Sequence, residues 1–122
     1  MIFQFDKTNE ADKIVADRDR LAQVFDNLFR NALEAMPWGG TLKISAKKES
    51  DIYRIKVSDE GKDFSTEERE RIFEPFYTTK SGGTGLGLTI SREIIEAHGG
   101  KIYLDSGAAR GACFVVELPE KI

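Results

Sequence analysis

The stretch that decides the fold is residues 19–61, DRLAQVFDNLFRNALEAMPWGGTLKISAKKESDIYRIKVSDEG. It predicts a helix from about Asp17 or Asp19 to Met36, because Pro37 and the paired glycines that follow stop a helix. Apolar residues recur at helical spacing, namely Leu21, Val24, Phe25, Leu28, Ala32 and Ala35. An adjacent stripe is polar and consists of Gln23, Asn27, Arg30, Asn31 and Glu34. One face of this helix therefore belongs to a core and its neighbour carries polar groups.

Two neighbouring strands follow this helix. Residues 41–46 and 52–58 both alternate apolar with polar side chains, so each strand buries one face. Further strands are expected at Ile2 to Phe5, Lys13 to Ala16, Ile102 to Asp105 and Ala112 to Leu118. Strands and helices do not alternate strictly, which favours an α+β two-layer sandwich with about three helices on one face of a mixed, about five-stranded sheet.

Two more helices are expected in the second half of the chain. Ser65-Thr66-Glu67-Glu68 is a capping-box start for a short helix that leads to Phe73. A glycine-dense loop from Ser81 to Gly87 precedes a third helix, which ends around His98-Gly99-Gly100 because glycines terminate helices. No repeat or linker divides the sequence, so residues 1–122 are expected to form one domain.

Composition narrows the function classes. The 122 residues are 40% hydrophobic and 32% charged, which supports one core. The 18 Lys and Arg against 21 Asp and Glu give a net charge of -3 without a basic cluster, so no nucleic-acid partner is expected. Cys113 is the only cysteine, which excludes an internal disulfide and suits a reducing, cytoplasmic location. No stretch approaches the ~20 apolar residues of a membrane span, so no membrane contact by this domain is expected.

Asp59 is the first candidate for chemistry. Ile55, Val57 and Asp59 lie two apart in one strand, so the carboxylate should point toward the core. A buried carboxylate requires hydrogen-bond donors, and the amino group of adenine is one such donor. The alternative is an aspartate that caps the turn at the end of the strand.

A glycine-rich loop and two asparagines are further candidates. The loop, residues 82–88, precedes a helix whose free amides and dipole favour phosphate, although it has neither P-loop nor Rossmann spacing. A flexible turn is the alternative. Asn27 and Asn31 lie four apart on the first helix, and amide oxygens suit Mg²⁺ where phosphates supply other ligands. Solvated asparagines are the alternative there.

Four motifs taken together resemble the N, G1, F and G2 boxes of histidine kinase catalytic domains. They are, in chain order, Asn27-Leu28-Phe29-Arg30-Asn31-Ala32, Asp59-Glu60-Gly61, Phe73-Glu74-Pro75-Phe76 and Gly83-Thr84-Gly85-Leu86-Gly87-Leu88. The resemblance covers essentially the whole chain, and four motifs in this order are far more specific than any one of them. The superfamily also contains Hsp90, type II topoisomerases and the MutL mismatch-repair protein.

The resemblance implies an activity and its residues. Such a domain binds Mg-ATP and donates the γ-phosphoryl to a histidine on a dimerising helical domain, from which it passes to a response-regulator receiver domain. Asp59 would accept from adenine, Gly61 would let the chain pass close to the base, and Asn31 would ligate Mg²⁺ with Asn27 assisting. The other ATP-binding residues implied are Arg30, Phe76, Thr79, Lys80, Gly83, Thr84, Gly85, Leu86, Gly87 and Leu88.

The resemblance also implies a mobile ATP lid at about residues 62–83. Phe73 and Phe76 would be apolar pins that dock this lid or face the partner domain. Lys80 would neutralise charge near the β- or γ-phosphate, which makes it a catalytic candidate together with Asn31. The alternative for Lys80 is an exposed lysine in solution.

Two departures from the family pattern are present. Asp63 replaces a common glycine and tolerates left-handed dihedrals less readily, which bears on lid geometry. Ala112 replaces a common threonine and removes a hydroxyl beside Asp59, which would weaken adenine binding. His98, the only histidine, is not expected to be the phospho-acceptor, because it lies at a helix end where it can cap carbonyls.

Two other classes remain open at this point. A chaperone- or topoisomerase-like ATPase module would carry a water-activating glutamate where this chain has Asn27, with Glu34 one turn beyond Asn31. A non-catalytic ATP-sensing interaction module would be favoured if Asp63 and Ala112 weakened the pocket. The carboxylate beside Asn31 is what distinguishes an ATPase from a kinase.

Overall fold

The structure, a computed structural model, describes residues 2–7, 18–61, 64–77, 87–105 and 111–120 of the chain. Its elements, in chain order, are β1 (Ile2–Lys7), α1 (Arg18–Ala35), β2 (Thr41–Glu49), β3 (Ile52–Ser58), α2 (Thr66–Arg71), α3 (Gly87–Ala97), β4 (Lys101–Leu104) and β5 (Cys113–Pro119). No described helix is both long and apolar enough to cross a membrane.

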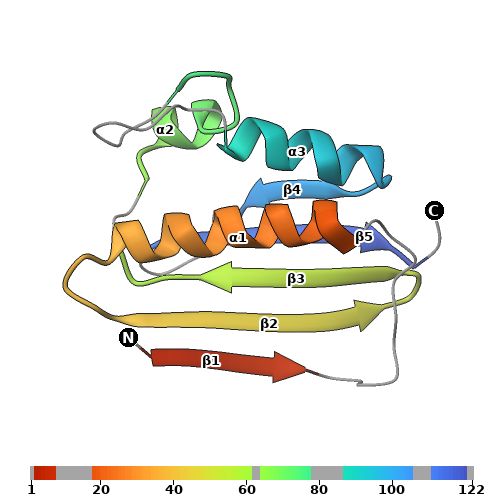
Figure 1. Ribbon diagram of the computed structural model, residues 1–122, viewed down its shortest axis with the longest axis horizontal. Helices are drawn as coiled ribbons and strands as arrows, with labels where there is room; N and C mark the ends of the chain where they lie inside the picture. Colours follow the sequence, from red (N-terminus) through yellow and green to blue (C-terminus); the bar gives the residue numbers. More distant parts are fainter. Residues whose placement is uncertain (1, 8–17, 62–63, 78–86, 106–110, 121–122) are drawn as a thin grey trace.

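The five strands form one mixed sheet in the order β1-β2-β3-β5-β4 (Figure 1). β1 pairs with β2 in parallel, and the other neighbours are antiparallel, with Val57 opposite Phe114 between β3 and β5. The predicted mixed sheet is confirmed, and β1 extends two residues beyond the predicted Phe5. The strand expected at Lys13 to Ala16 lies outside the described residues.

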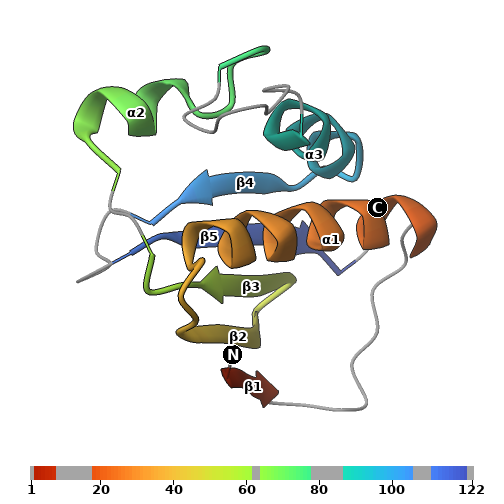
Figure 2. The same cartoon turned by 60° about the vertical axis from the view of Figure 1, so that its left-hand side comes forward.

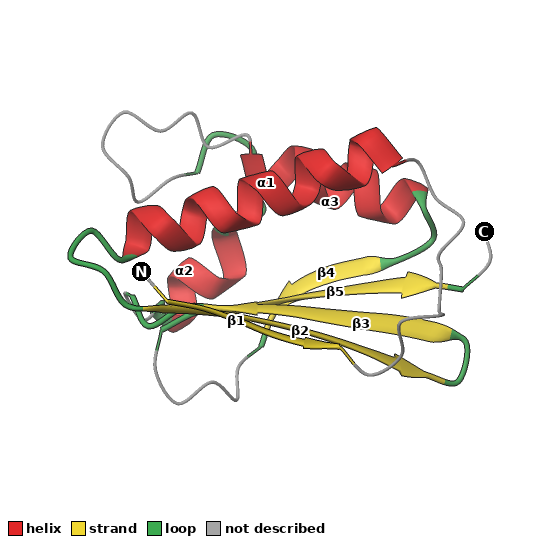
Figure 3. Cartoon of the chain, turned by 60° about the horizontal axis from the view of Figure 1, so that its bottom comes forward, coloured by secondary structure: helices red, strands yellow, loops and turns green. Residues whose placement is uncertain are grey.

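α1 and α3 lie side by side on one face of the sheet, and the other face carries no helix among the described residues (Figures 2 and 3). α1 faces the sheet with the apolar stripe predicted for it, in which Val24, Leu28 and Ala32 are buried. β5 supplies the opposite wall through its buried Phe114 and Val116. Full burial of side chains such as Leu28 stabilises the fold by about 1.5–3 kcal/mol each. The predicted α+β two-layer sandwich is confirmed.

α3 ends in a Schellman motif, as the glycines after it indicated. Gly99 adopts φ +79°, its N–H donates to Glu96 O at 2.9 Å, and the N–H of Gly100 donates to Ile95 O at 3.0 Å. His98 is buried at this end, with Nδ1 2.8 Å from Ile94 O. The prediction that His98 has a structural role at a helix end is confirmed by this contact.

α2 is attached to the core at both of its ends. It begins with the predicted capping box, in which the Ser65 hydroxyl accepts from the N–H of Glu68 and the Glu68 carboxylate accepts from the N–H of Ser65. Phe64 before it and Phe73 after it both contact the ring of Phe114 edge-on, at centroid distances of 6.5 and 6.3 Å. The segment around α2 is therefore anchored on β5, although α2 itself buries no residue.

Candidate functional site

Asp59 lies in the first turn after β3 and is only 6% exposed. Its N–H donates to Ala112 O at 2.9 Å, which extends the β3–β5 ladder by one step and keeps the side chain on the core face. Oδ1 accepts from the N–H of Gly61 at 2.8 Å and from the N–H of Ala112 at 3.4 Å. The coreward carboxylate is confirmed, and the bond from Gly61 shows that Asp59 also caps its own turn.

The environment of Asp59 disfavours its charged form. Burial raises the pKa of the carboxyl, and the amide donors of Gly61 and Ala112 lower it only in part. Both of these hydrogen bonds end on Oδ1 and come from the backbone. A ligand that donates a hydrogen bond to Oδ2 would stabilise the ionised form, which makes Asp59 a selective acceptor.

The raised pKa predicts a stability that depends on pH. The folded state binds more protons than the unfolded chain between the ordinary pKa of 3.8 and the raised one, so the free energy of unfolding should fall as pH rises through that window. Asp59→Asn has no such group, and the wild-type protein should therefore lose stability relative to this variant as pH rises. Urea unfolding of both proteins at several pH values measures the difference, and parallel pH profiles would contradict it.

The turn that holds Asp59 is closely packed against α1 and β5. A Cβ at Gly61 would collide with the carbonyl oxygen of Ala35 at the end of α1. A Cβ at Gly111, which also has φ +75°, would collide with the carbonyl of Asp59 itself. Glycine is required at both positions for the backbone to approach this closely, and the close approach fixes Asp59 relative to α1.

A second part of the site lies where α3 begins beside α1. A pocket of about 180 Å³ opens there, and its lining residues are Gln23, Asn27, Arg30, Gly87, Ile90 and Ser91. The Asn27 amide nitrogen donates to the Ser91 hydroxyl at 3.3 Å. The structure thus brings together three residues predicted for one site, Asn27, Arg30 and Gly87, from segments far apart in the sequence.

Three pocket residues were not predicted as site residues, although each carries a signal. Gln23 lies four residues before Asn27 on the predicted polar stripe, so it shares the same face of α1. Ser91 lies four residues after Gly87 on α3 and is 2% exposed, so a hydroxyl is buried there. Ile90 is 39% exposed and forms an apolar part of the lining.

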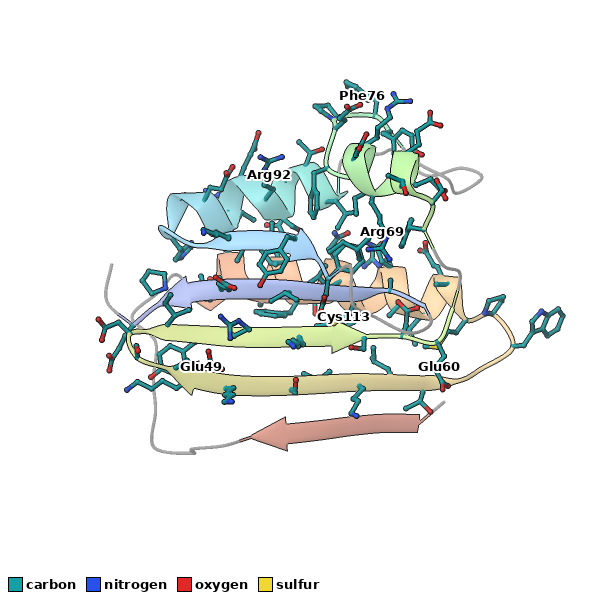
Figure 4. The ribbon with its side chains drawn as sticks, turned by 180° about the vertical axis from the view of Figure 1, so that it is seen from behind. Glu49, Glu60, Arg69, Phe76, Arg92 and Cys113 are labelled. Atoms are coloured by element: carbon teal, nitrogen blue, oxygen red, sulfur yellow. The ribbon has the colours of Figure 1, made fainter. Side chains whose placement is uncertain are left out.

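The remaining predicted residues fall in three groups. Phe76 adopts φ +67° and is 74% exposed, and it lies in the connection between α2 and α3, away from the sheet (Figure 4). Leu88 packs against the core from the first turn of α3. Thr79, Lys80, Gly83, Thr84, Gly85 and Leu86 lie outside the described residues, as does Asp63.

α1 connects the two parts of the site. Asn27, Asn31 and Ala35 are four residues apart and lie on one side of the helix. Asn27 lies against Gly87 at one end, and Ala35 lies against Gly61 at the other. Eight residues of helix span about 12 Å. The arrangement suits an elongated ligand with a hydrogen-bond donor near Asp59 and phosphate or another anion near the start of α3.

Comparisons with known proteins place this arrangement in context. The sequence model of the family described as histidine kinase-, DNA gyrase B-, and HSP90-like ATPase matches residues 16–122. Sensor histidine kinase ZraS of Salmonella typhimurium is 45% identical over 108 residues, which are 88% of this chain and 23% of ZraS. The chain therefore spans about a quarter of the length of that relative.

Solved structures agree in fold. The catalytic domain of histidine kinase ThkA has a TM-score of 0.90 and 42% identity, over 98% of this chain and 79% of that one. ThkA in complex with the response regulator protein TrrA gives a TM-score of 0.84 and 39% identity, over 97% of this chain and 34% of that one. Full-length ShkA in complex with AMPPNP gives 0.85 and 30%, over 97% and 25%.

Proposed function

The chain belongs to the histidine kinase-, DNA gyrase B- and HSP90-like ATPases, as a histidine kinase catalytic domain, and on that basis we propose that it binds Mg-ATP and donates the γ-phosphoryl to a histidine. The acceptor would lie on a separate, dimerising helical domain, and the phosphoryl would then pass to a response-regulator receiver domain. The observation that carries the proposal is the buried Asp59 carboxylate, joined along α1 to the pocket at Asn27 and Gly87.

The residues present fit Mg-ATP. Asp59 would accept from the adenine amino group through Oδ2, because its Oδ1 already accepts two backbone N–H groups. Asn31 would ligate Mg²⁺ with Asn27 assisting, since amide oxygens are hard ligands and the phosphates supply others. Arg30 and the backbone around Gly87 and Leu88 would hold the phosphates at the start of α3. When bound, Mg-ATP supplies the phosphoryl group, and the protein contributes positioning and charge stabilisation.

Lys80 completes the proposed set of catalytic residues together with Asn31. Thr79 and the glycine-rich residues Gly83, Thr84, Gly85 and Leu86 would contribute further contacts to ATP. Asn27 carries an amide, which cannot act as a general base on water, so the phosphoryl should be kept for the acceptor histidine. This amide favours a kinase over an ATPase module. ATP as substrate also favours a cytoplasmic location.

Phe76 is the residue we propose for contact with the helical domain. A bulky side chain at φ +67° is held in a sparsely populated conformation, which is typical of functional sites. Its ring is 74% exposed and points away from the sheet (Figure 4), whereas Phe73 is anchored against Phe114 and Arg92. In this assignment Phe73 docks the segment and Phe76 meets the partner.

Hydrogen exchange with and without Mg-ATP tests the function and the lid at residues 62–83 together. Without nucleotide, amides of residues 64–77 should exchange faster than those of α1, because this segment is held by a few apolar contacts at its ends. Mg-ATP should slow exchange there and at Asp59 to Gly61. Protection equal to that of α1 in the nucleotide-free protein would argue against a lid, and no change on adding Mg-ATP would argue against nucleotide binding.

A further inference from the structure

Ser91 is one of three buried polar or charged side chains among the described residues, and the only one still without a role. Asp59 and His98 are the other two; the first has its place in the proposed adenine contact and the second ends α3. Ser91 is 2% exposed, lies in the second turn of α3 and faces α1. A buried hydroxyl costs free energy unless it is hydrogen-bonded, and its partner is Asn27.

Asn27 is held at both ends of its side-chain amide. Nδ2 donates to the Ser91 hydroxyl at 3.3 Å. Oδ1 faces Gly87 so closely that a Cβ there would collide with it. Gly87 and Ser91 are one helical turn apart, so both contacts come from one face of α3. The amide is thereby fixed with its nitrogen toward Ser91 and its oxygen toward the first residue of α3.

We infer that Ser91 is a positioning residue for the phosphate end of the nucleotide, acting through Asn27. This inference rests on the proposed function. The Ser91 hydroxyl occupies Nδ2, so the other end of the amide, Oδ1, stays directed to the start of α3, where phosphate and Mg²⁺ would lie. Without the hydroxyl, the amide can rotate, and an asparagine that turns its NH₂ toward the metal is no ligand. Ser91 itself touches neither adenine nor metal in this assignment.

A pair of variants that differ only in the hydroxyl tests this inference. Ser91→Thr keeps the hydroxyl and Ser91→Val replaces it with a methyl group of the same shape, so any strain from the added bulk is common to both. Ser91→Val should bind Mg-ATP about three- to tenfold more weakly than Ser91→Thr, as expected for the loss of one hydrogen bond. Ser91→Ala should show a loss of the same size relative to wild type. Thermal unfolding of all variants shows whether each one folds.

Two further measurements separate positioning from packing. Adenosine has no phosphates, so its affinity should be equal in Ser91→Val and Ser91→Thr. In a double-mutant cycle, Ser91→Ala should cost nothing more for Mg-ATP once Asn27→Ala is present, because Ser91 acts through Asn27. Equal Mg-ATP affinity of the Thr and Val variants, or additive losses in the cycle, would overturn the inference. Failure of the wild-type chain to bind Mg-ATP would instead overturn the proposed function.

Discussion

Asp59→Asn should weaken Mg-ATP binding by more than about 1.5 kcal/mol while the protein remains folded. The two backbone N–H groups of Gly61 and Ala112 donate to Oδ1, and the amide oxygen of asparagine can accept them in the same place. The NH₂ group must then stand where Oδ2 was, and there it opposes the amino group of adenine. Turning the amide around is no remedy, because NH₂ would then face both backbone donors. The fold is preserved and the adenine contact is lost.

Calorimetric titration of both proteins with Mg-ATP measures this effect, with urea unfolding to compare their stability. Glu60→Gln is the matched control, because it removes a carboxylate from the same turn at an exposed position and keeps an oxygen that can accept from the Thr41 N–H. Its affinity should stay close to that of the wild-type protein. An Asp59→Asn variant that bound Mg-ATP as tightly as wild type would remove Asp59 from the adenine site.

The features that local sequence patterns could predict are those that depend on neighbours in the chain. The period of two along β3 placed Asp59 on the face of Ile55 and Val57, and its burial follows from that phase. The capping box at Ser65 and the termination of α3 at Gly99 were likewise predictable, because three to five residues complete each motif. Such motifs need no tertiary contact to be recognised.

The rest of the site depends on tertiary packing that no local pattern encodes. Asn27 and Ser91 are 64 residues apart, and their hydrogen bond exists only because α1 and α3 pack side by side. The anchoring of Phe73 likewise requires Phe114 from the last strand, so a segment that looked poor in apolar residues is attached at both ends. Spacing alone predicted polar stripes and glycines, but not which of their atoms would meet.

The second large effect concerns the division of labour between domains. Alone, the chain should bind Mg-ATP yet neither label itself nor hydrolyse it quickly, because its only histidine is buried at the end of α3 and Asn27 cannot activate water. Adding a dimerising helical domain with its histidine should produce ³²P transfer from labelled ATP, because docking brings nucleophile and γ-phosphate into reach. His98→Gln should leave this transfer intact.

Asn31→Ala should then reduce labelling of the helical domain by more than about 100-fold, because loss of even an outer-shell partner of a metal site costs roughly 10- to 100-fold. Asn31 lies on the half-buried polar stripe of α1 beside the core, so the variant should remain folded. Asp26→Ala, at an exposed position of the same helix, is the matched control and should label like wild type. Labelling is followed as ³²P incorporation into the helical domain. Phosphate on His98, or ATP turnover by the isolated chain at the rate of a dedicated ATPase, would contradict these assignments.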